Sequence, residues 1–238
     1  MKKILHPAST RGTANFGWLQ AKYSFSFANY FDPNRIQFGK LRVLNDDMVA
    51  PSMGFGKHPH QNMEIVTIPQ EGALKHHDSM GNEGVIESGD IQIMSAGSGV
   101  EHSEINANTD KPVKLFQIWV FPEEDNVKPR YDQKKIASLI RPNEISAVVK
   151  PKNHASEDEL WVHQQAWFNL GEFNSDKQTT YRLHHPSHGA YIFVIQGKVA
   201  VDGEVLTDRD AIGVWETDAV DLEIEANTRL LVIEVPMN

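Results

Sequence analysis

Short runs of apolar residues, separated by turn-forming residues, repeat along the whole chain. The clearest runs are rich in β-branched and aromatic side chains: MEIVTI (63–68), IQIM (91–94), KLFQIWVF (114–121), YIFVIQG (191–197) and RLLVIEV (229–235). Gly, Asn, Asp and Pro cluster between them, as in the turns that join strands. Strands this short at near-regular intervals are typical of an all-β sandwich or barrel.

One stretch has a helical pattern instead. DQKKIASLI (132–140) begins with Asp132, a good helix N-cap, and predicts about two helical turns. It lies within residues 126–143, which are rich in charge and proline. We interpret this segment as a connector between an N-terminal domain, residues 1–125, and a C-terminal domain, residues 144–238.

The two halves resemble each other weakly. Each half places an aliphatic strand before a glycine turn, at 65–72 and at 192–197, and an acidic turn follows at 88–90 and at 208–210. A duplicated antiparallel β-barrel is the simplest interpretation of this repeat. The alternative is one larger β-sandwich in which the similarity is coincidental.

Charge and composition exclude several classes of protein. The chain has 23 basic and 32 acidic residues, a net charge of −9, and no basic block. Direct binding to nucleic acid is therefore not expected, because that affinity rests on Lys and Arg neutralising phosphates. No apolar run is long enough for a signal peptide or for the roughly 18–20 residues of a membrane span, so we expect a cytoplasmic protein. There is no cysteine, which excludes disulfides and thiolate metal sites.

Histidines supply the candidate chemistry. HPHQNME (58–64) places His58 and His60 two residues apart, and SGVEHSEIN (98–106) places His102 and Glu104 at the same spacing. Side chains two residues apart share one face of a strand, so each pair can converge on one ion. If the two strands are neighbours, three imidazoles and one carboxylate occupy four positions of an octahedral ion and leave two open. Histidines on an exposed strand that bind nothing are the alternative.

The donor set narrows the choice of ion. Imidazole with carboxylate suits one divalent transition metal, and a structural zinc site would more often be tetrahedral and closed. We favour Fe(II), with Mn, Ni, Cu, Co or Zn as alternatives for the same ligands. Glu64 shares the face of His58 and His60 if the strand continues, and it is a second candidate for the carboxylate.

The longest motif indicates a family. Residues 58–104, with HPH, the EIVT strand, DSMGN, the GD turn and SAGSGVEHSE, resemble the signature region of the pirin family, a branch of the cupin superfamily. YSFSFANYFDP (23–33) and LFQIWVFP (115–122) resemble further motifs of that family. The resemblance implies a bicupin, with two antiparallel, jelly-roll-like β-barrel domains.

The resemblance also assigns the residues of the site. It implies that His58, His60, His102 and Glu104 hold the metal in the N-terminal barrel. Glu64 would then lie outside the ligand set and orient an imidazole through its ring N–H.

The second half lacks the same set. Only His184 lies near an equivalent ligand position, and residues 214–227 contain no histidine. We therefore expect a metal-free C-terminal domain in which His184, His185 and His188 are loop residues.

Some pirin-like proteins resemble quercetin 2,3-dioxygenases, which open the central ring of a flavonol. The resemblance thus implies a dioxygenase that takes a flavonol or related phenolic substrate and O2, with Glu104 as the catalytic base. The alternative is a redox-sensing regulator that binds a protein partner through the oxidation state of its metal, without turnover. A metal-dependent isomerase or an enzyme for another phenol is a third interpretation.

Overall fold

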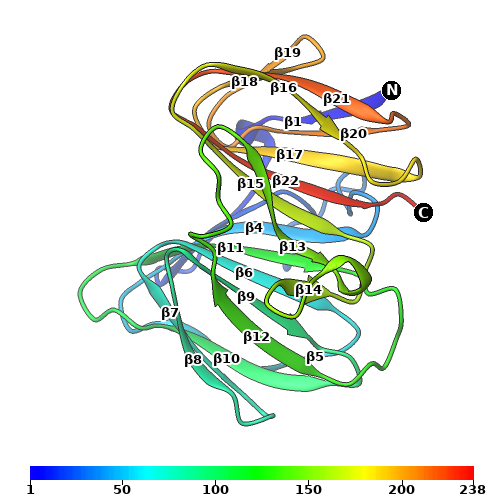
Figure 1. Ribbon diagram of the computed structural model, residues 1–238. Helices are drawn as coiled ribbons and strands as arrows, with labels where there is room; N and C mark the ends of the chain where they lie inside the picture. Colours follow the sequence, from blue (N-terminus) through cyan, green and yellow to red (C-terminus); the bar gives the residue numbers. More distant parts are fainter.

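The computed structural model describes residues 1–238 and consists almost entirely of β-strands arranged in two stacked halves (Figure 1). Each half contains one seven-stranded and one four-stranded sheet, and these sheets stay open at their edges. The arrangement confirms the predicted all-β class with two cupin-type domains. The structure contains no helix that could span a membrane.

The N-terminal half uses nearly every strand up to residue 135. Its larger sheet has the order β12 (Arg130–Lys135), β9 (Asp90–Ser95), β6 (Glu64–Glu71), β11 (Val113–Val120), β4 (Leu41–Val49), β3 (Leu19–Tyr23) and β2 (Gly12–Asn15). Its smaller sheet has the order β5 (Gly54–His60), β10 (Val100–Asn106), β7 (Ala73–Asp78) and β8 (Glu83–Glu87).

The C-terminal half is built in the same way. Its larger sheet has the order β1 (Lys2–His6), β20 (Ala211–Trp215), β17 (His188–Gln196), β22 (Thr228–Pro236), β15 (Trp167–Phe173), β13 (Ile145–Pro151) and β14 (Leu160–Val162). Its smaller sheet has the order β16 (Lys177–Arg182), β21 (Ala219–Ile224), β18 (Val199–Val201) and β19 (Glu204–Leu206). Two short 3-10 helices, η1 (Ala8–Thr10) and η2 (Lys152–His154), complete the elements.

The strand orders establish the duplication. The central run β9-β6-β11-β4 corresponds to β20-β17-β22-β15, and the four-stranded sheets correspond strand by strand. The repeated sequence motifs at 65–72 and 192–197 fall on the equivalent strands β6 and β17. The predicted internal repeat is therefore confirmed, and positions in the two halves can be compared through their strand registers.

In each half, one edge strand of the larger sheet comes from a segment that was not expected in that half. The N-terminal strand β1 pairs with β20 in the C-terminal half, where Figure 1 shows it in blue. Strand β12, from the segment expected to be only a connector, pairs with β9 in the N-terminal half. The predicted helix over 132–140 is wrong from its first residue, because Asp132 lies within β12. The free edge of β9 offers partners for the backbone N–H and C=O groups of this segment, and that pairing outweighs a weak helical preference.

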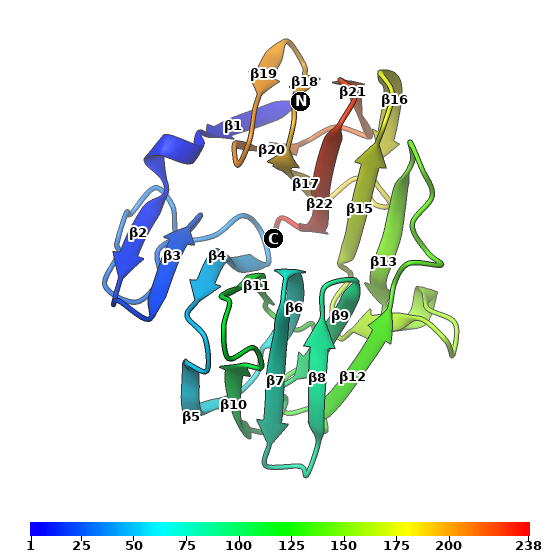
Figure 2. The same ribbon diagram turned by 90° about the vertical axis from the view of Figure 1, so that its left-hand side faces the viewer.

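The largest apolar cluster, of 26 buried residues, lies where the two seven-stranded sheets face each other (Figure 2). Phe116 of β11 meets Phe193 of β17 across this interface, with ring centroids 5.5 Å apart. The interior of the C-terminal half is a second continuous cluster of 15 residues. The interior of the N-terminal half holds only two smaller clusters, of 8 and 4 residues. Polar side chains lie in the same interior, and they form the candidate site.

Candidate metal centre

Strands β5 and β10 are hydrogen-bonded neighbours, so the two histidine motifs meet. His58 lies directly opposite His102 in the antiparallel register, and His60 lies opposite Val100. The register shifts between His102 and Glu104, where β10 has an irregularity. Such a bulge re-aims the side chains that follow it.

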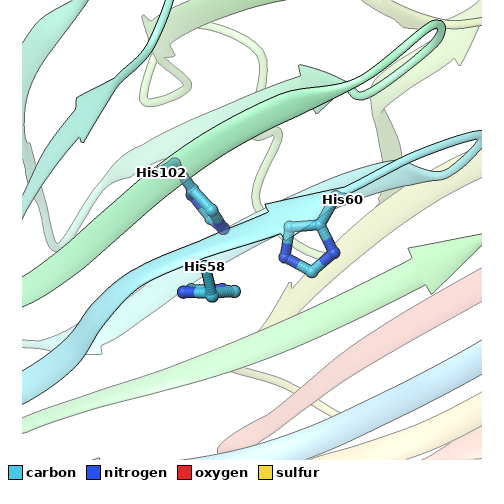
Figure 3. Close-up of side chains that lie close together, drawn as sticks. All are labelled: His58, His60 and His102. Carbon is cyan, nitrogen blue, oxygen red and sulfur yellow. The ribbon is translucent and has the colours of Figure 1, made fainter.

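Three imidazole rings cluster inside the N-terminal half. Figure 3 shows His58 and His60 from β5 beside His102 from β10. Ring centroids are 4.4 Å apart for His58 and His102, and 4.9 Å apart for the other two pairs. One nitrogen from each ring lies within 4.8 Å of the others. This spacing is compatible with three donors around one ion.

The hydrogen bonds of the rings leave nitrogens free for a ligand. His58 places Nδ1 2.7 Å from the carbonyl oxygen of Gly56, so Nδ1–H donates and Nε2 is left as a lone-pair donor. His102 is buried, and neither of its ring nitrogens has a partner in the protein. A buried polar group without a partner is uncommon in proteins and is expected where an ion or ligand completes the site.

Burial keeps these rings neutral. It lowers the pKa of His60 to about 4, with a smaller contribution from the neighbouring His58. It also lowers the pKa of His102 to about 2, again with contributions from the adjacent imidazoles. Neutral imidazole is the form that binds metals, so both rings are ready to donate at neutral pH.

Glu104 provides a carboxyl group beside the imidazoles. It is buried, and Gln117 Nε2 donates to Oε2 at 2.9 Å while Thr67 Oγ1 lies 3.4 Å from Oε1. Burial raises the pKa of Glu104 to about 7, against the opposing effect of these hydrogen bonds. A carboxylate oxygen of Glu104 lies within 4.8 Å of nitrogens of His102 and His76. Glu104 also lines one cavity with His58 and His60. His102 connects these residues, because its ring nitrogens lie within 4.8 Å of ligand atoms of all three.

His76 belongs to the same cluster, although it was not among the expected ligands. Its side chain is fully buried, whereas the neighbouring His77 side chain is 57% exposed. His76 Nε2 lies 3.2 Å from Asp78 Oδ2, and its ring lies between the rings of His102 and Tyr131. The inward alternation of Leu74, His76 and Asp78 along β7 is the sequence signal that identifies it.

Glu64 has a different role from the one expected. A turn separates it from β5, so it does not continue the face of His58 and His60. Its Oε2 accepts hydrogen bonds from Ser95 Oγ at 2.8 Å and from the backbone N–H of His163 at 3.0 Å. None of its hydrogen bonds reaches an imidazole ring. Glu64 therefore links β6 to the C-terminal half and does not orient a metal ligand.

The cavity beside the histidines has a volume of about 200 Å³. Most of its exposed surface is apolar, although only five of its eleven lining residues are aromatic or aliphatic: Leu19, Tyr23, Phe27, Asn45, Asp47, Phe55, His58, His60, Glu104, Gln117 and Trp119. Trp119 meets both His60 and Phe27 edge-on, at 4.9 and 5.3 Å between ring centroids. An apolar pocket with a few convergent polar groups is the usual form of a small-molecule site.

A larger cleft of about 660 Å³ lies between the two halves of the molecule. It is lined by residues of both large sheets and of the segment 136–142, among them Ile68, Leu170 and Arg229. No histidine lines it. The histidine-lined cavity is therefore the better candidate for chemistry, although it is smaller.

The equivalent interior of the C-terminal half is apolar. In the N-terminal half Thr67 pairs with Gln92 and Gln117 on the neighbouring strands. In the C-terminal half, Ile192 occupies the position that corresponds to Thr67, and it pairs with Ile212 and Val232 on the neighbouring strands. Both groups of ligand-like side chains that could hold an ion lie in the N-terminal half. The interior that surrounds the site in one half is thus a hydrophobic core in the other.

Two of the three C-terminal histidines bind one buried carboxylate. Glu234 Oε2 lies 2.8 Å from His184 Nδ1 and accepts a hydrogen bond from the Tyr181 hydroxyl at 2.8 Å. Glu234 Oε1 lies 2.8 Å from His188 Nδ1 and accepts the His184 backbone N–H at 2.8 Å. These hydrogen bonds lower the pKa of Glu234 to about 2 although burial opposes them. His184 and His185 lie in the loop as expected, but His188 begins β17 and is buried.

Comparison with known proteins agrees with this architecture. Residues 6–120 match the family model described as Pirin, and residues 149–235 match the one described as the quercetinase C-terminal cupin domain. A protein named quercetin 2,3-dioxygenase from Escherichia coli (strain K12) is 37% identical over 232 residues, 98% of each chain. A pirin-like protein from Caulobacter vibrioides is 35% identical over 96% of this chain and 97% of its own.

Solved structures give the same result. The crystal structure of YhhW from Escherichia coli matches with a TM-score of 0.92 and 36% identity, over 99% of this chain and 98% of that one. A structure of the bacterial pirin YhhW in complex with nickel(II) matches with a TM-score of 0.91 and 35% identity, over 99% of both chains. With this identity over almost its full length, the chain belongs to the pirin family of cupin proteins.

Proposed function

We propose that His58, His60, His102 and Glu104 hold one divalent transition metal. We further propose that the protein cleaves flavonols or related phenolics with O2 in the adjoining cavity. The observation that carries the proposal is the cluster of three imidazoles, with the buried carboxyl group of Glu104 close to His102, beside a cavity lined by aromatic side chains. Glu104 is the proposed catalytic base.

The donor set supports a transition metal. Two of the imidazoles are neutral at neutral pH, and His102 has no partner for either ring nitrogen. Nitrogen with one carboxylate and no thiolate suits Fe, Mn, Co, Ni, Cu or Zn. Fe(II) is the proposed native ion because the reaction requires O2. The nickel(II) complex of the related YhhW supports the capacity of this kind of site for other divalent ions.

The cavity wall supports a flat aromatic ligand. Phe27, Phe55 and Trp119 line it together with Tyr23 and Leu19. Aromatic side chains pack against planar rings in stacked or edge-on geometry, which orients the ring and excludes water. The names of the relatives, quercetin 2,3-dioxygenase among them, support a flavonol in particular.

The chemistry divides between the metal and the protein. A bound divalent ion supplies Lewis acidity that lowers the pKa of a flavonol hydroxyl and brings O2 into reach. Glu104 takes the hydroxyl proton as its carboxylate becomes a carboxylic acid. Gln117 and Thr67 hold the carboxyl group in place during the transfer.

The test is loss of quercetin by protein reconstituted with Fe(II) under anaerobic conditions and then exposed to air. We expect metal-dependent loss with release of carbon monoxide, and no turnover in His60→Ala. His77→Ala is the matched control, because this exposed imidazole lies outside the cluster.

The alternative function gives a different result in the same experiment. Stoichiometric metal binding without loss of any flavonol would contradict the dioxygenase proposal. It would favour a regulator that binds a protein partner according to the oxidation state of its metal.

A further inference from the structure

Two polar residues on β4 have unsatisfied oxygens in the cavity wall. Asn45 and Asp47 are two residues apart on one face of the strand, and both line the cavity. Their residues are 2% and 4% exposed, respectively. Asn45 Oδ1 and Asp47 Oδ1 are buried and have no hydrogen-bond partner in the protein.

The polar neighbour of these residues on β11 is already engaged. Across the sheet, Asn45 lies opposite Gln117, and Asp47 lies opposite the apolar Leu115. The amide of Gln117 donates to Glu104, and its carbonyl oxygen lies 3.4 Å from Thr67 Oγ1. The protein therefore supplies no hydrogen-bond partner for either oxygen, although both residues line the cavity.

The C-terminal half shows that this arrangement is not a requirement of the fold. Asn169 of β15 occupies the position equivalent to Asn45. Asn169 pairs with Val232, Asn45 pairs with Gln117, and Val232 and Gln117 are themselves at equivalent positions. The Asn169 amide donates to Val232 O and to the Tyr181 hydroxyl, both at 3.1 Å. No buried side-chain atom of Asn169 lacks a partner, so the same position can be satisfied internally. A buried acceptor without a partner costs stability, and such costs are retained where a ligand removes them.

We propose that Asn45 and Asp47 accept hydrogen bonds from hydroxyl groups on the part of the ligand that points away from the metal. Polyhydroxylated phenolics would then bind more tightly than aromatic ligands without these hydroxyl groups. The two side chains are about 7 Å apart along the strand, since each residue rises about 3.3 Å. They can therefore accept hydrogen bonds from two separate places on an elongated ligand. The inference rests on the proposed function for the ligand's entry into this cavity, and it adds the residues that set its selectivity.

The test is equilibrium binding of quercetin and of 3-hydroxyflavone to zinc-loaded protein. Zinc has no redox chemistry, so binding is measured without turnover. Both probes carry the same 3-hydroxyl and 4-keto groups, and quercetin adds hydroxyls on its outer rings. We expect the wild-type protein to bind quercetin roughly tenfold or more tightly than 3-hydroxyflavone, because quercetin makes one or two additional hydrogen bonds.

The variants Asn45→Leu and Asp47→Leu remove the acceptors with little change in side-chain size. In the double variant we expect the ratio of the two affinities to fall to near one, through weaker quercetin binding. The metal-free variant should melt at or above the wild-type temperature, because an unpartnered polar pair has been removed. Asp47→Asn keeps an acceptor oxygen and should keep the preference. Gln20→Leu, an exposed change on the adjacent β3, is the control.

An unchanged preference in the double variant would overturn the inference. So would equal loss of both affinities with a lower melting temperature, which indicates a structural role, or failure of the wild-type protein to bind either probe. Loss of Fe(II)-dependent cleavage is a separate result. A protein that prefers quercetin through these residues but does not cleave it would refute the dioxygenase proposal alone.

Discussion

His58 and His102 lie directly opposite each other on β5 and β10, with ring centroids 4.4 Å apart. The strand register alone fixes this pair, because a slip of one residue would turn either side chain to the other face of the sheet. His60 and Glu104 follow at a spacing of two residues, so two short motifs about 40 residues apart produce one cluster.

Replacement of His102 by Gln should weaken metal binding by at least about a hundredfold. This exceeds the usual effect of losing a residue that only forms a hydrogen bond to a metal ligand. His102 is the ring that lies near every other member of the cluster. Competition with a chromophoric zinc chelator measures the affinity. His77→Gln should bind as the wild-type protein does, and equal affinity for the two variants would contradict the assignment.

Metal affinity should fall as the pH drops below 7. The pKa of Glu104 in the metal-free protein is about 7, so at lower pH the ion must displace a proton from this carboxyl group. One displaced proton lowers the affinity about tenfold per pH unit below that pKa, and the dependence flattens above it. Titrations between about pH 5.5 and 8.5 give the slope. Glu104→Gln should have a smaller slope, and an unchanged slope would show that another group is titrated.

Glu234→Gln should destabilise the protein by roughly 3 kcal/mol at neutral pH, as follows from a carboxyl pKa near 2 in the folded protein and about 4.5 when unfolded. Because the folded pKa is the lower one, this stabilisation is complete above pH 4.5. It is lost as the pH falls toward 2. Urea unfolding at neutral pH and at about pH 3 measures the difference between the variant and the wild-type protein.

We expect that difference to shrink at the lower pH. Glu216→Gln is the control, because Glu216 forms an exposed ion pair with Lys2 whose contribution is less than about 1 kcal/mol. A Glu234 variant as stable as the wild-type protein would contradict the account of the C-terminal histidines.

Phe116→Ala should cost about 3–5 kcal/mol, the usual range for a buried phenylalanine. Phe116 is fully buried between the two large sheets and contacts Phe193 of the other half. Because the cluster joins both halves, the loss should lower the midpoint of one common unfolding transition, measured by circular dichroism and tryptophan fluorescence. Phe31→Ala, at a residue 73% exposed, should change little. Two separate transitions would show that the halves are not coupled.

Local sequence patterns were sufficient to predict most of the strands and the two pairs of candidate ligands. Alternation along HPH and EHSE depends only on neighbouring residues, and the repeated glycine turns revealed the duplication. Long-range pairing was not predictable in the same way. The segment 132–135 is a strand because β9 has a free edge beside it, and β1 completes a sheet whose other strands begin more than 140 residues later.

The remaining parts of the site depend on which face of a strand turns inward. Asn45 and Asp47 look like ordinary polar residues in LRVLNDDMV (41–49), and Asp46 between them faces the opposite side toward Arg11. Only the three-dimensional arrangement shows that two of these polar side chains enter the cavity. Glu64 was misplaced for a similar reason, because the turn after His60 breaks the alternation on which the expectation rested.

Anomalous diffraction from crystals loaded with a single divalent metal would locate the ion among the proposed ligands. We expect one peak in the N-terminal half, within coordination distance of nitrogens from His58, His60 and His102 and of a Glu104 oxygen. We expect no peak among His184, His188 and Glu234. A strong peak held by His76 and Asp78 without His58 and His60, or no peak in the N-terminal half at all, would contradict the proposed metal site.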